Sequence, residues 1–451
     1  MNDSEKKQKI NKKKRILFIL IFICCACIVA IFAVGIATSN NAGNGNTGSG
    51  SAARASVHSG ALGSDSGSNN AAGFGGDSSV SDSGSASGIV GSGASSYTGE
   101  SVAESSSPET ITLAFAGDIN FDDNWVNMQH YHAIGDDLNA VIDPVFQDEF
   151  KSADLAWINN EFTYSTRGRA LSGKAYTFKA NPSNVQILNT LGIDIVGLAN
   201  NHIFDYGADA FLDTLTTLQN AGIAYVGAGM NSDEAFAPKY MKVKDLTIGF
   251  VAASRAEKIK YTPEATADSP GIMLCYDNTN IDASIKEADA KSDFVVVLPH
   301  WGDEYSNAAN DIQKADAAEY IENGADVVIG AHPHVLQGLD VIDGKYVDYS
   351  LGNFWFNEKT LDTEICELEI TYETSAENKV SAARESGSTS EKSVSKDNEN
   401  IISVKMKIIP GQQKNCETKA LTDASEKRAL FDRLQSYSDG ITIDDDGYVS
   451  K

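Results

Sequence analysis

An apolar run of strand length leads directly into two histidines, and this pattern constrains the fold more than any other in the chain. Residues 327–329 are all β-branched, as is typical of a buried strand, and His332 and His334 follow after two small residues. Two imidazoles with this spacing at a strand end can reach the same point, as a metal site requires. The chain has only seven histidines in 451 residues, so a pair within three positions favours a metal site over unrelated side chains.

Similar apolar runs recur from residue 111 onward and alternate with helical patterns. The other strand-length runs are residues 111–116, 155–158, 195–198, 248–252 and 294–298. Helical patterns lie at residues 211–222, with an expected end at Gly222, and at residues 281–290, 312–323 and 424–437. Alternating strands and helices predict an α/β fold. The pattern becomes strand-rich near the C-terminus, where residues 364–372 and 401–409 are expected to form a hairpin.

The N-terminal quarter of the chain is expected to lie outside the folded domain. Residues 1–15 form a basic segment that is expected to stay cytoplasmic, and residues 16–37 are uncharged and long enough for a transmembrane anchor. A cleaved signal peptide is the alternative, although its apolar core is usually shorter. Residues 38–108 are rich in Gly and Ser and are predicted to form a disordered linker. The prediction is a single-pass protein of the cell membrane with its catalytic domain extracellular.

The folded domain is predicted at residues 109–438. A polar, Ser-rich insertion at residues 373–400 is expected to be disordered, and residues 439–451 are expected to form a tail. Three cysteines lie outside the apolar segment, and an odd number does not indicate a disulfide framework. Cys366 and Cys416 either pair across the expected hairpin or remain free.

The net charge of −26 bears on the partners of this chain. The first 37 residues carry seven basic and two acidic side chains, so about −31 remains on the rest. Such acidity predicts no nucleic-acid partner, because phosphate backbones select clustered Lys and Arg. A small anionic substrate held by metal ions remains compatible with this charge.

Side chains of metal-binding types follow five of the apolar runs. They are Asp118, Glu161, Asn201 with His202, His300, and His332 with His334. Loops at the carboxyl ends of strands carry function in α/β sheets, so these side chains are expected to converge on one crevice. Carboxylates, imidazoles and an amide oxygen together suit a centre of two divalent ions, with Mn, Zn or Fe as candidates.

Each of these segments also has an ordinary structural explanation when it is taken alone. Gly-Asp at position 118 is commonly a turn, Glu161 a solvated loop acid, and His300 a buried core histidine. Asn201 and His202 can also cap the next helix. The recurrence of such residues at successive strand ends favours the site. His130 and His132 lie in a polar helical stretch and are predicted to be surface residues.

Four basic residues follow Glu161 in the chain: Arg167, Arg169, Lys174 and Lys179. They either bind an anionic substrate or form a solvated loop face, and the solvated face is the preferred interpretation.

The motifs resemble those of the CapA/PgsA family, which is associated with capsule and poly-γ-glutamate synthesis and belongs to the calcineurin-like metallophosphatase superfamily. The matching segments are residues 116–118, 159–161, 198–202, 205–207, 300–302 with 304–305, 330–334 and 349–354. Together they cover roughly residues 111–357. The resemblance implies a four-layer α/β/β/α metallophosphatase-like sandwich, which the spacing of the residues alone does not indicate.

The resemblance also implies roles for individual residues. One metal ion would be held by Asp118 and His334, and the other by Asn201, His300 and His332. Glu161 takes the position where metallophosphatases usually have a bridging Asp, and Asn120 the position where many have a metal-binding His. His202 would protonate or stabilise the leaving group. The residues expected to carry catalysis are therefore Asp118, Glu161 and His202.

Two functions of different classes follow from these features. The first is an extracytoplasmic metal-dependent hydrolase that acts on a phosphoester, or on an amide or ester bond of an anionic envelope polymer. The second is a non-catalytic subunit of a membrane complex that synthesises or exports such a polymer, with polymer synthase subunits as partners. The complete set of ligand-type residues favours the hydrolase.

Overall fold

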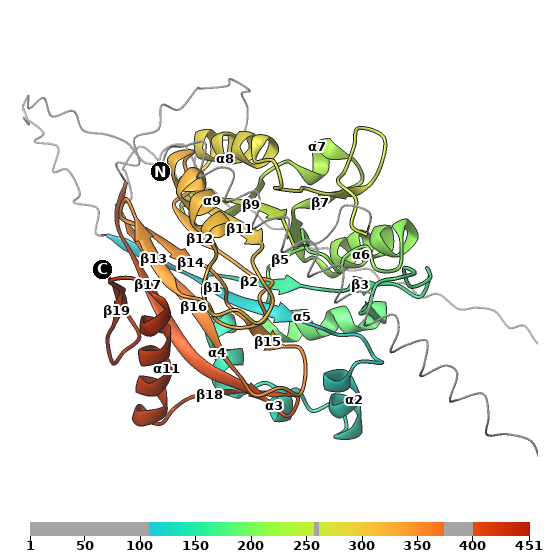
Figure 1. Ribbon diagram of the computed structural model, residues 1–451, viewed down its shortest axis with the longest axis horizontal. Helices are drawn as coiled ribbons and strands as arrows, with labels where there is room; N and C mark the ends of the chain where they lie inside the picture. The colour runs from blue at the N-terminus through green and yellow to red at the C-terminus, as the bar shows by residue number, and fades with distance from the viewer. Residues whose placement is uncertain (1–107, 257–260, 374–399) are drawn as a thin grey trace, which may run out of the picture. The chain divides into compact units, whose positions relative to one another are not determined.

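The computed structural model describes residues 108–256, 261–373 and 400–451, which form one folded unit. Two β-sheets pack face to face, and helices cover their outer faces (Figure 1). The mixed α/β fold predicted from the alternation of strands and helices is therefore confirmed. The predicted segments 1–15, 16–37 and 38–108 and the insertion at 373–400 lie almost entirely outside the described residues. Within the described residues no helix is long and apolar enough to span a membrane.

The larger sheet has eight strands, with β1 and β2 near its centre. In sheet order its strands are β18 (Glu417–Ala420), β17 (Ile401–Lys414), β16 (Leu361–Tyr372), β1 (Glu109–Ile119), β2 (Leu155–Asn160), β5 (Ile195–Gly197) and β6 (Ala224–Val226), with β15 (Asn353–Trp355) paired to β1. Strands β1, β2, β5 and β6 are parallel, whereas β16 and β17 form the predicted antiparallel hairpin. The parallel part brings the carboxyl ends of β1, β2 and β5 to one edge.

The smaller sheet has six strands, and it too has a parallel central part. In sheet order they are β13 (Leu339–Ile342), β14 (Lys345–Asp348), β12 (Val327–Ile329), β11 (Phe294–His300), β9 (Leu246–Ser254) and β8 (Lys239–Val243). Strands β9, β11, β12 and β14 run parallel to one another, and β8 and β13 close the edges in antiparallel orientation. Three two-stranded sheets are separate: β3 (Thr163–Tyr164) with β4 (Lys179–Ala180), β7 (Ala228–Gly229) with β10 (Gly271–Ile272), and β19 (Thr442–Ile443) with β20 (Val449–Ser450).

Helices flank both sheets. They are α2 (Val126–Ala133), α3 (Leu138–Val141), α4 (Pro144–Ser152), α5 (Val185–Leu191) after the 3₁₀ turn η1 (Pro182–Asn184), α6 (Ala208–Ala221), α7 (Ser232–Ala235), α8 (Thr279–Lys291), α9 (Asp311–Glu322) and α11 (Ala424–Tyr437). Local sequence sets several of their ends. Asn310 and Gln313 form a capping box at the start of α9, and Gly222 ends α6 in the left-handed conformation at φ 76°.

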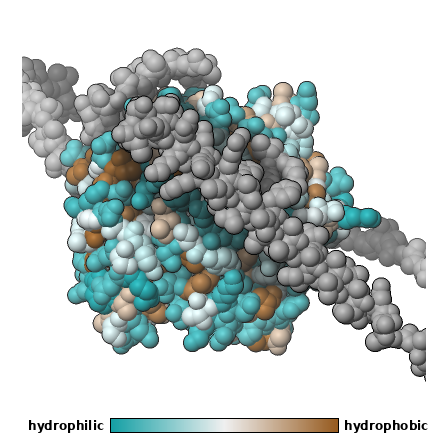
Figure 2. Space-filling view, viewed as in Figure 1, coloured by the Kyte–Doolittle hydropathy of each residue, from teal (hydrophilic) through white to brown (hydrophobic). Residues whose placement is uncertain are grey.

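Alternate residues of the smaller sheet belong to two different cores. In β11, Phe294 and Val296 pack into the core shared with the larger sheet, whereas Val295 and Val297 face α8 and α9. This period of two explains why the β11 sequence is apolar throughout, since both of its faces are buried. The result is a layer of helices, two layers of sheet and a second layer of helices (Figure 1). The described surface visible from this side is mostly hydrophilic, with hydrophobic side chains scattered among polar ones (Figure 2).

Two features near the C-terminus refine the expectations. Residues 439–451, expected as a tail, form the β19–β20 hairpin and bury Ile441, Ile443 and Val449, so they belong to the folded unit. Cys366 and Cys416 are both buried and free, so the disulfide that the sequence left open is not formed.

Candidate metal centre

The predicted ligand residues converge where the carboxyl ends of strands from both sheets meet. Asp118 lies near the end of β1, Glu161 follows β2, Asn201 and His202 follow β5, His300 ends β11, and His332 and His334 follow β12. All seven side chains are buried or nearly so. The structure therefore brings together every residue that the sequence analysis assigned to the site.

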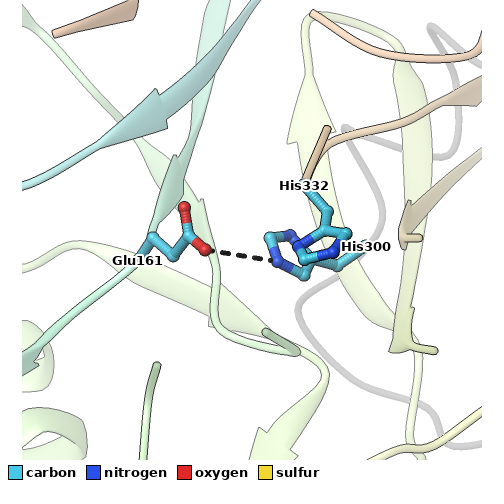
Figure 3. Close-up of side chains that lie close together, drawn as sticks. All are labelled: Glu161, His300 and His332. Carbon is cyan, nitrogen blue, oxygen red and sulfur yellow. Dashed lines mark ion pairs between the residues drawn. The ribbon is translucent and has the colours of Figure 1, made fainter. Parts of the chain in front are cut away.

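Glu161 is the residue shared by two groups of ligand-type side chains. One group is Glu161 with His300 and His332, and the other is Glu161 with Asp118 and His334; within each group the ligand atoms all lie within 4.8 Å of one another. Figure 3 shows the Glu161 carboxylate facing His300 and His332 across a narrow gap. Glu161 Oε1 lies 3.5 Å from His300 Nε2, and Glu161 Oε2 lies 3.9 Å from His334 Nδ1. The two oxygens of one carboxylate thus face different groups.

Asn201 completes the group around His300. Its Oδ1 atom lies 2.8 Å from His300 Nε2, and the rings of His300 and His332 are 4.8 Å apart between centroids. Nδ1 of His332 is buried without a hydrogen-bond partner. An amide oxygen, a carboxylate and two imidazoles around one point are a ligand set for a divalent ion of the Zn, Mn or Fe type.

Two asparagines support the second group. Asn159 Nδ2 donates to Asp118 Oδ1 at 2.7 Å and lies 3.3 Å from His300 Nδ1. Asn353 Oδ1 lies 2.8 Å from His334 Nδ1, which is also 3.1 Å from Asp118 Oδ2. Such contacts fix the orientation of ligand side chains and leave their remaining atoms directed at the site.

Asp118 and His334 form a charged pair in the absence of an ion. Burial raises the pKa of Asp118, but the hydrogen bond and positive charge of His334 outweigh it and bring the pKa below 3.8. Burial lowers the pKa of His334, yet the charge of Glu161 and the hydrogen bond that His334 donates to Asp118 raise it to about 10. The His334 proton must therefore leave when an ion binds this group, because a ligating imidazole is neutral.

The other ligand residues are driven toward their neutral forms. Burial, followed by the charge of Asp118, raises the pKa of Glu161 well above 4.5. Burial lowers the pKa of His300 to about 3 and that of His332 well below 6.5. The neutral imidazoles of His300 and His332 can each donate a ring-nitrogen lone pair to a metal ion. A positive charge beside Glu161 would stabilise its ionised form, which the nearby Asp118 carboxylate disfavours.

His202 is held by a hydrogen bond on the side of its ring away from Glu161. Its Nδ1 donates to Asp205 Oδ2 at 2.6 Å, and its Nε2 lies 3.9 Å from Glu161 Oε1. Asp205 also accepts from the Phe178 backbone N–H at 2.8 Å and pairs with Lys174 Nζ at 2.7 Å. Burial lowers the pKa of His202, and the charge of Asp205 opposes that effect. The arrangement fixes His202 with Nε2 toward the site.

The loop that carries His332 and His334 has a strained backbone. Both residues have positive φ, 100° for His332 and 59° for His334, which is uncommon for residues other than glycine. Backbone hydrogen bonds hold the loop: Ala331 N–H donates to Pro299 at 3.1 Å, and Tyr305 N–H donates to Pro333 at 2.8 Å. Strain of this kind persists where surrounding structure imposes it and is concentrated at functional sites.

The buried polar atoms fit divalent ions. Among the described residues, both carboxylate oxygens of Glu161 and Nδ1 of His332 are buried without a hydrogen-bond partner. A buried polar atom without a partner raises the free energy of the folded state, and an ion bound between these atoms would lower it. The donor set therefore fits divalent ions, with Glu161 shared by the two ligand groups.

Several other residues differ from or extend the expectations. His130 and His132 lie on α2, outside both groups, as predicted for surface residues. Asn120 belongs to neither group; its Oδ1 accepts the Asp122 backbone N–H at 2.9 Å. Lys174 corrects the prediction of a solvated loop face, because its side chain is only 6% exposed and pairs with Asp205.

Three residues near the site had no role assigned from sequence, namely Asn159, Asp205 and Lys174. The first two lie inside the motifs that carry Glu161 and His202, so their spacing was the available signal. Lys174 lies in a loop without periodicity, and no local pattern marks its burial. Arg167, in contrast, is exposed as expected and pairs with Asp213.

The sequence relatives identify the family. Residues 112–358, more than half of the chain, match the family described as bacterial capsule synthesis protein PGA_cap, so the chain belongs to this family. It is 30% identical over 275 residues to the PGA biosynthesis protein CapA of Bacillus subtilis, which covers 58% of this chain and 69% of that protein. It is 35% identical over 200 residues to the capsule biosynthesis protein CapA of Bacillus anthracis, covering 42% and 47% of the two chains.

Similarity to solved structures is weaker. A putative 5′-nucleotidase from Staphylococcus aureus overlaps 73% of this chain and 58% of its own, at 15% identity and a TM-score of 0.37. An overlap of this extent supports no conclusion about the present chain.

Proposed function

We propose that this protein is a metal-dependent hydrolase that acts in the biosynthesis of a capsule or of a poly-γ-glutamate-type envelope polymer. Its substrate would be a phosphoester, or an amide or ester bond of an anionic envelope polymer. Family membership supports the biological setting, since the family is described by capsule synthesis and one relative by PGA biosynthesis. The buried ligand groups support the chemistry.

The observation that carries the proposal is the position of Glu161 between two groups of ligand-type side chains. Asp118, Glu161 and His334 would hold one divalent ion, and Glu161, Asn201, His300 and His332 the other. Two such ions supply an activated water nucleophile and stabilise charge that develops on the oxygens of the reacting group. Manganese, zinc and iron all suit this donor set.

His202 is placed to move a proton beside these residues. A water molecule attacks the phosphorus or carbonyl carbon and gives a proton to His202 Nε2, which carries none in the neutral ring. The bond to the leaving oxygen or nitrogen breaks, and the leaving atom takes that proton from His202 Nε2. Asp205 holds the opposite ring nitrogen at 2.6 Å and would stabilise the protonated ring.

The proposed location is the outer face of the cell membrane. The apolar residues 16–37 would anchor the chain, and the Gly/Ser-rich residues 38–108 would carry the folded unit away from the bilayer. Protease treatment of intact cells tests this placement, since the folded unit is then cleaved while residues 1–15 are protected.

The activity test uses the full chain in detergent, stripped with chelator and reloaded with Mn²⁺, Zn²⁺ or Fe²⁺. We expect two ions per chain by elemental analysis and hydrolysis of phosphomonoesters, phosphodiesters or γ-glutamyl amides. His202→Gln should lower kcat by about 10²–10⁴-fold while both ions remain bound. His132→Gln, on the exposed face of α2, is the matched control and should retain activity. Turnover that does not depend on metal and His202 would contradict the proposal.

A non-catalytic role in a polymer synthase or export complex is the second candidate. It is supported by the family description and by the expected anchor, and the metal centre would then be structural or would bind polymer carboxylates. Capture of the full chain from membranes should then recover synthase subunits. A His202→Gln strain that makes normal amounts of polymer would favour this role over hydrolysis.

A further inference from the structure

A cavity of about 480 Å³ opens directly beside the metal centre. His202 and His334 form its inner end, and Trp125, Tyr176, Phe178, Tyr305 and Phe356 line its walls. Its volume lies within the range of roughly 300–1,000 Å³ typical of small-molecule sites. A substrate whose reacting bond reaches the metal-binding residues must place its adjoining part in this cavity.

The aromatic walls of the cavity are in contact with the two histidines. Phe178 lies 4.5 Å from the His202 ring between centroids, and Phe356 lies 4.9 Å from the His334 ring. Trp125 packs edge-on against Phe178 at 5.0 Å, and its indole N–H donates to the Phe356 carbonyl at 2.8 Å. Because that N–H already has a partner, the Trp125 ring offers a ligand its apolar surface.

Two further rings are exposed at the cavity. Tyr176 is 61% exposed and Tyr305 is 46% exposed, whereas most large apolar side chains of the described chain are buried. Exposed aromatic rings beside a cavity are typical of binding sites rather than of ordinary surface. They extend the apolar wall from the two histidines to solvent.

The charges of the cavity do not suit a polyanion. Beyond His334 at its inner end, its charged lining consists of the carboxylates of Glu304 and Glu358 and the ammonium of Lys359, which lies over the Tyr305 ring at 3.8 Å. The nearby cations are also occupied, since Lys174 pairs with Asp205 and Arg167 with Asp213. Away from the metal-binding residues, a chain of carboxylates would meet two carboxylates and one ammonium on a strongly acidic protein.

We propose that this cavity binds the uncharged sugar ring of a sugar phosphate ester, with the phosphoryl group at the metal-binding residues. This inference rests on the proposed hydrolase function and names its substrate class. A sugar ring has apolar C–H faces that pack on aromatic rings and hydroxyl groups that donate hydrogen bonds. Glu304 and Glu358 supply acceptors for those hydroxyls, and no hydrogen bond or ion pair joins either carboxylate to another described side chain.

The kinetic test compares three phosphoesters on the Mn²⁺-loaded full chain: ethyl phosphate, phenyl phosphate and glucose 1-phosphate. We expect kcat/KM for glucose 1-phosphate to exceed both others by about tenfold, since each aromatic contact contributes roughly threefold to tenfold. Tyr176→Ala and Tyr305→Ala should each reduce that preference. Tyr437→Ala, an exposed tyrosine on α11, is the matched control and should leave it unchanged. Preference for phenyl phosphate would assign the cavity to aromatic groups and overturn the inference.

A binding test separates this inference from the hydrolase proposal. Saturation-transfer NMR with methyl α-D-glucopyranoside, on the full chain with and without Mn²⁺, should show contact that Tyr305→Ala weakens and Tyr437→Ala does not. Such contact without any turnover would support the sugar site and reject hydrolysis. Absence of contact, or stronger competition by γ-glutamyl oligomers than by the glucoside, would overturn the sugar site even if phosphoesters are hydrolysed.

Discussion

Glu161 Oε1 lies 3.5 Å from His300 Nε2, although Glu161 follows a strand of the larger sheet and His300 ends a strand of the smaller one. The candidate metal centre is therefore built across the junction of the two sheets. Each of the two ligand groups joins Glu161, from the larger sheet, to histidines of the smaller sheet. The distances within each group therefore depend on how the two sheets pack together. Ion binding should consequently be coupled to the stability of the whole folded unit.

Replacing Glu161 should abolish that coupling. Wild-type protein should bind two ions and gain about 2.7 kcal/mol per site at a free ion concentration of 100 Kd. Glu161→Gln should hold at most one ion and lose most of the metal-induced rise in Tm, because the shared carboxylate is gone. Elemental analysis and thermal unfolding with and without chelator measure both effects. Glu322→Gln, at an exposed position, is the control; two tightly bound ions in Glu161→Gln would exclude the bridging role.

Asp205 should affect the rate through His202. Asp205→Asn keeps the shape of the side chain but removes the charge that supports a protonated His202 ring, so kcat should fall by about 10–100-fold. KM should change little if the side chain does not contact substrate. The substitution also removes the charge that Asp205 sets against the buried Lys174 ammonium, so Tm should fall. Steady-state kinetics and thermal unfolding measure these effects, and Asp209→Asn on the exposed start of α6 is the control. An unchanged kcat would show that His202 does not need Asp205.

Asp348 and Glu364 should make stability depend on pH. Their side chains are fully buried, and the two carboxyl groups, on β14 and β16, affect each other's pKa. Burial raises the pKa of Asp348 to about 6, and burial with the charge of Asp348 raises that of Glu364 well above 4.5. The folded chain thus binds more protons than the unfolded chain, so this stabilisation is present at low pH and is lost as pH rises through about 6.

Glu364→Gln should flatten that dependence. In the wild type, the free energy of unfolding should fall between pH 5 and pH 8. In Glu364→Gln this fall should be smaller by about 1–3 kcal/mol. Denaturant titrations at several pH values, with chelator present, give the comparison. Glu322→Gln should follow the wild-type profile, and the pair would have no such role if Glu364→Gln did the same.

Gly117 should tolerate no side chain. A Cβ atom at this position would lie 1.8 Å from the Gly352 carbonyl oxygen, and Asp118, the next residue, donates its N–H to that same oxygen at 2.9 Å. Gly117→Ala should therefore displace β1 from the loop before β15, lower stability by about 2–4 kcal/mol and weaken metal binding. Gly135→Ala is the control, since its φ of 87° adds strain while nothing lies within 4 Å of the new atom. Equal Tm values for the two variants would contradict this account.

The elements with strong local patterns were predictable from sequence. The terminal helix α11 has the predicted bounds, and the β16–β17 hairpin joins the predicted segments. The site residues were predictable because each follows an apolar strand and parallel strands direct their carboxyl ends to one edge. The family resemblance added the pairing of residues into two groups, which strand positions alone do not specify.

The residues that escaped prediction depend on contacts between distant segments. Lys174 is polar, lies in an irregular loop and is buried only because Asp205 and the loop after β5 cover it. Tyr176 and Tyr305 come from separate loops and become neighbours of one cavity through the tertiary fold. The hairpin at residues 439–451 has short strands whose burial depends on packing beside α11 and β17. No local period marks such positions.

The placement of the ligand residues on two sheets also determines at which stage of synthesis and folding the chain can bind a metal ion. Asp118 lies in the first described strand, whereas His334 follows the twelfth, so a partly synthesised chain has no complete ligand group. The metal ion should therefore bind after translation. Its identity should depend on the metals available in the compartment where β12 joins the smaller sheet. The same chain produced in different compartments should then carry different metals, without any change in its ligands.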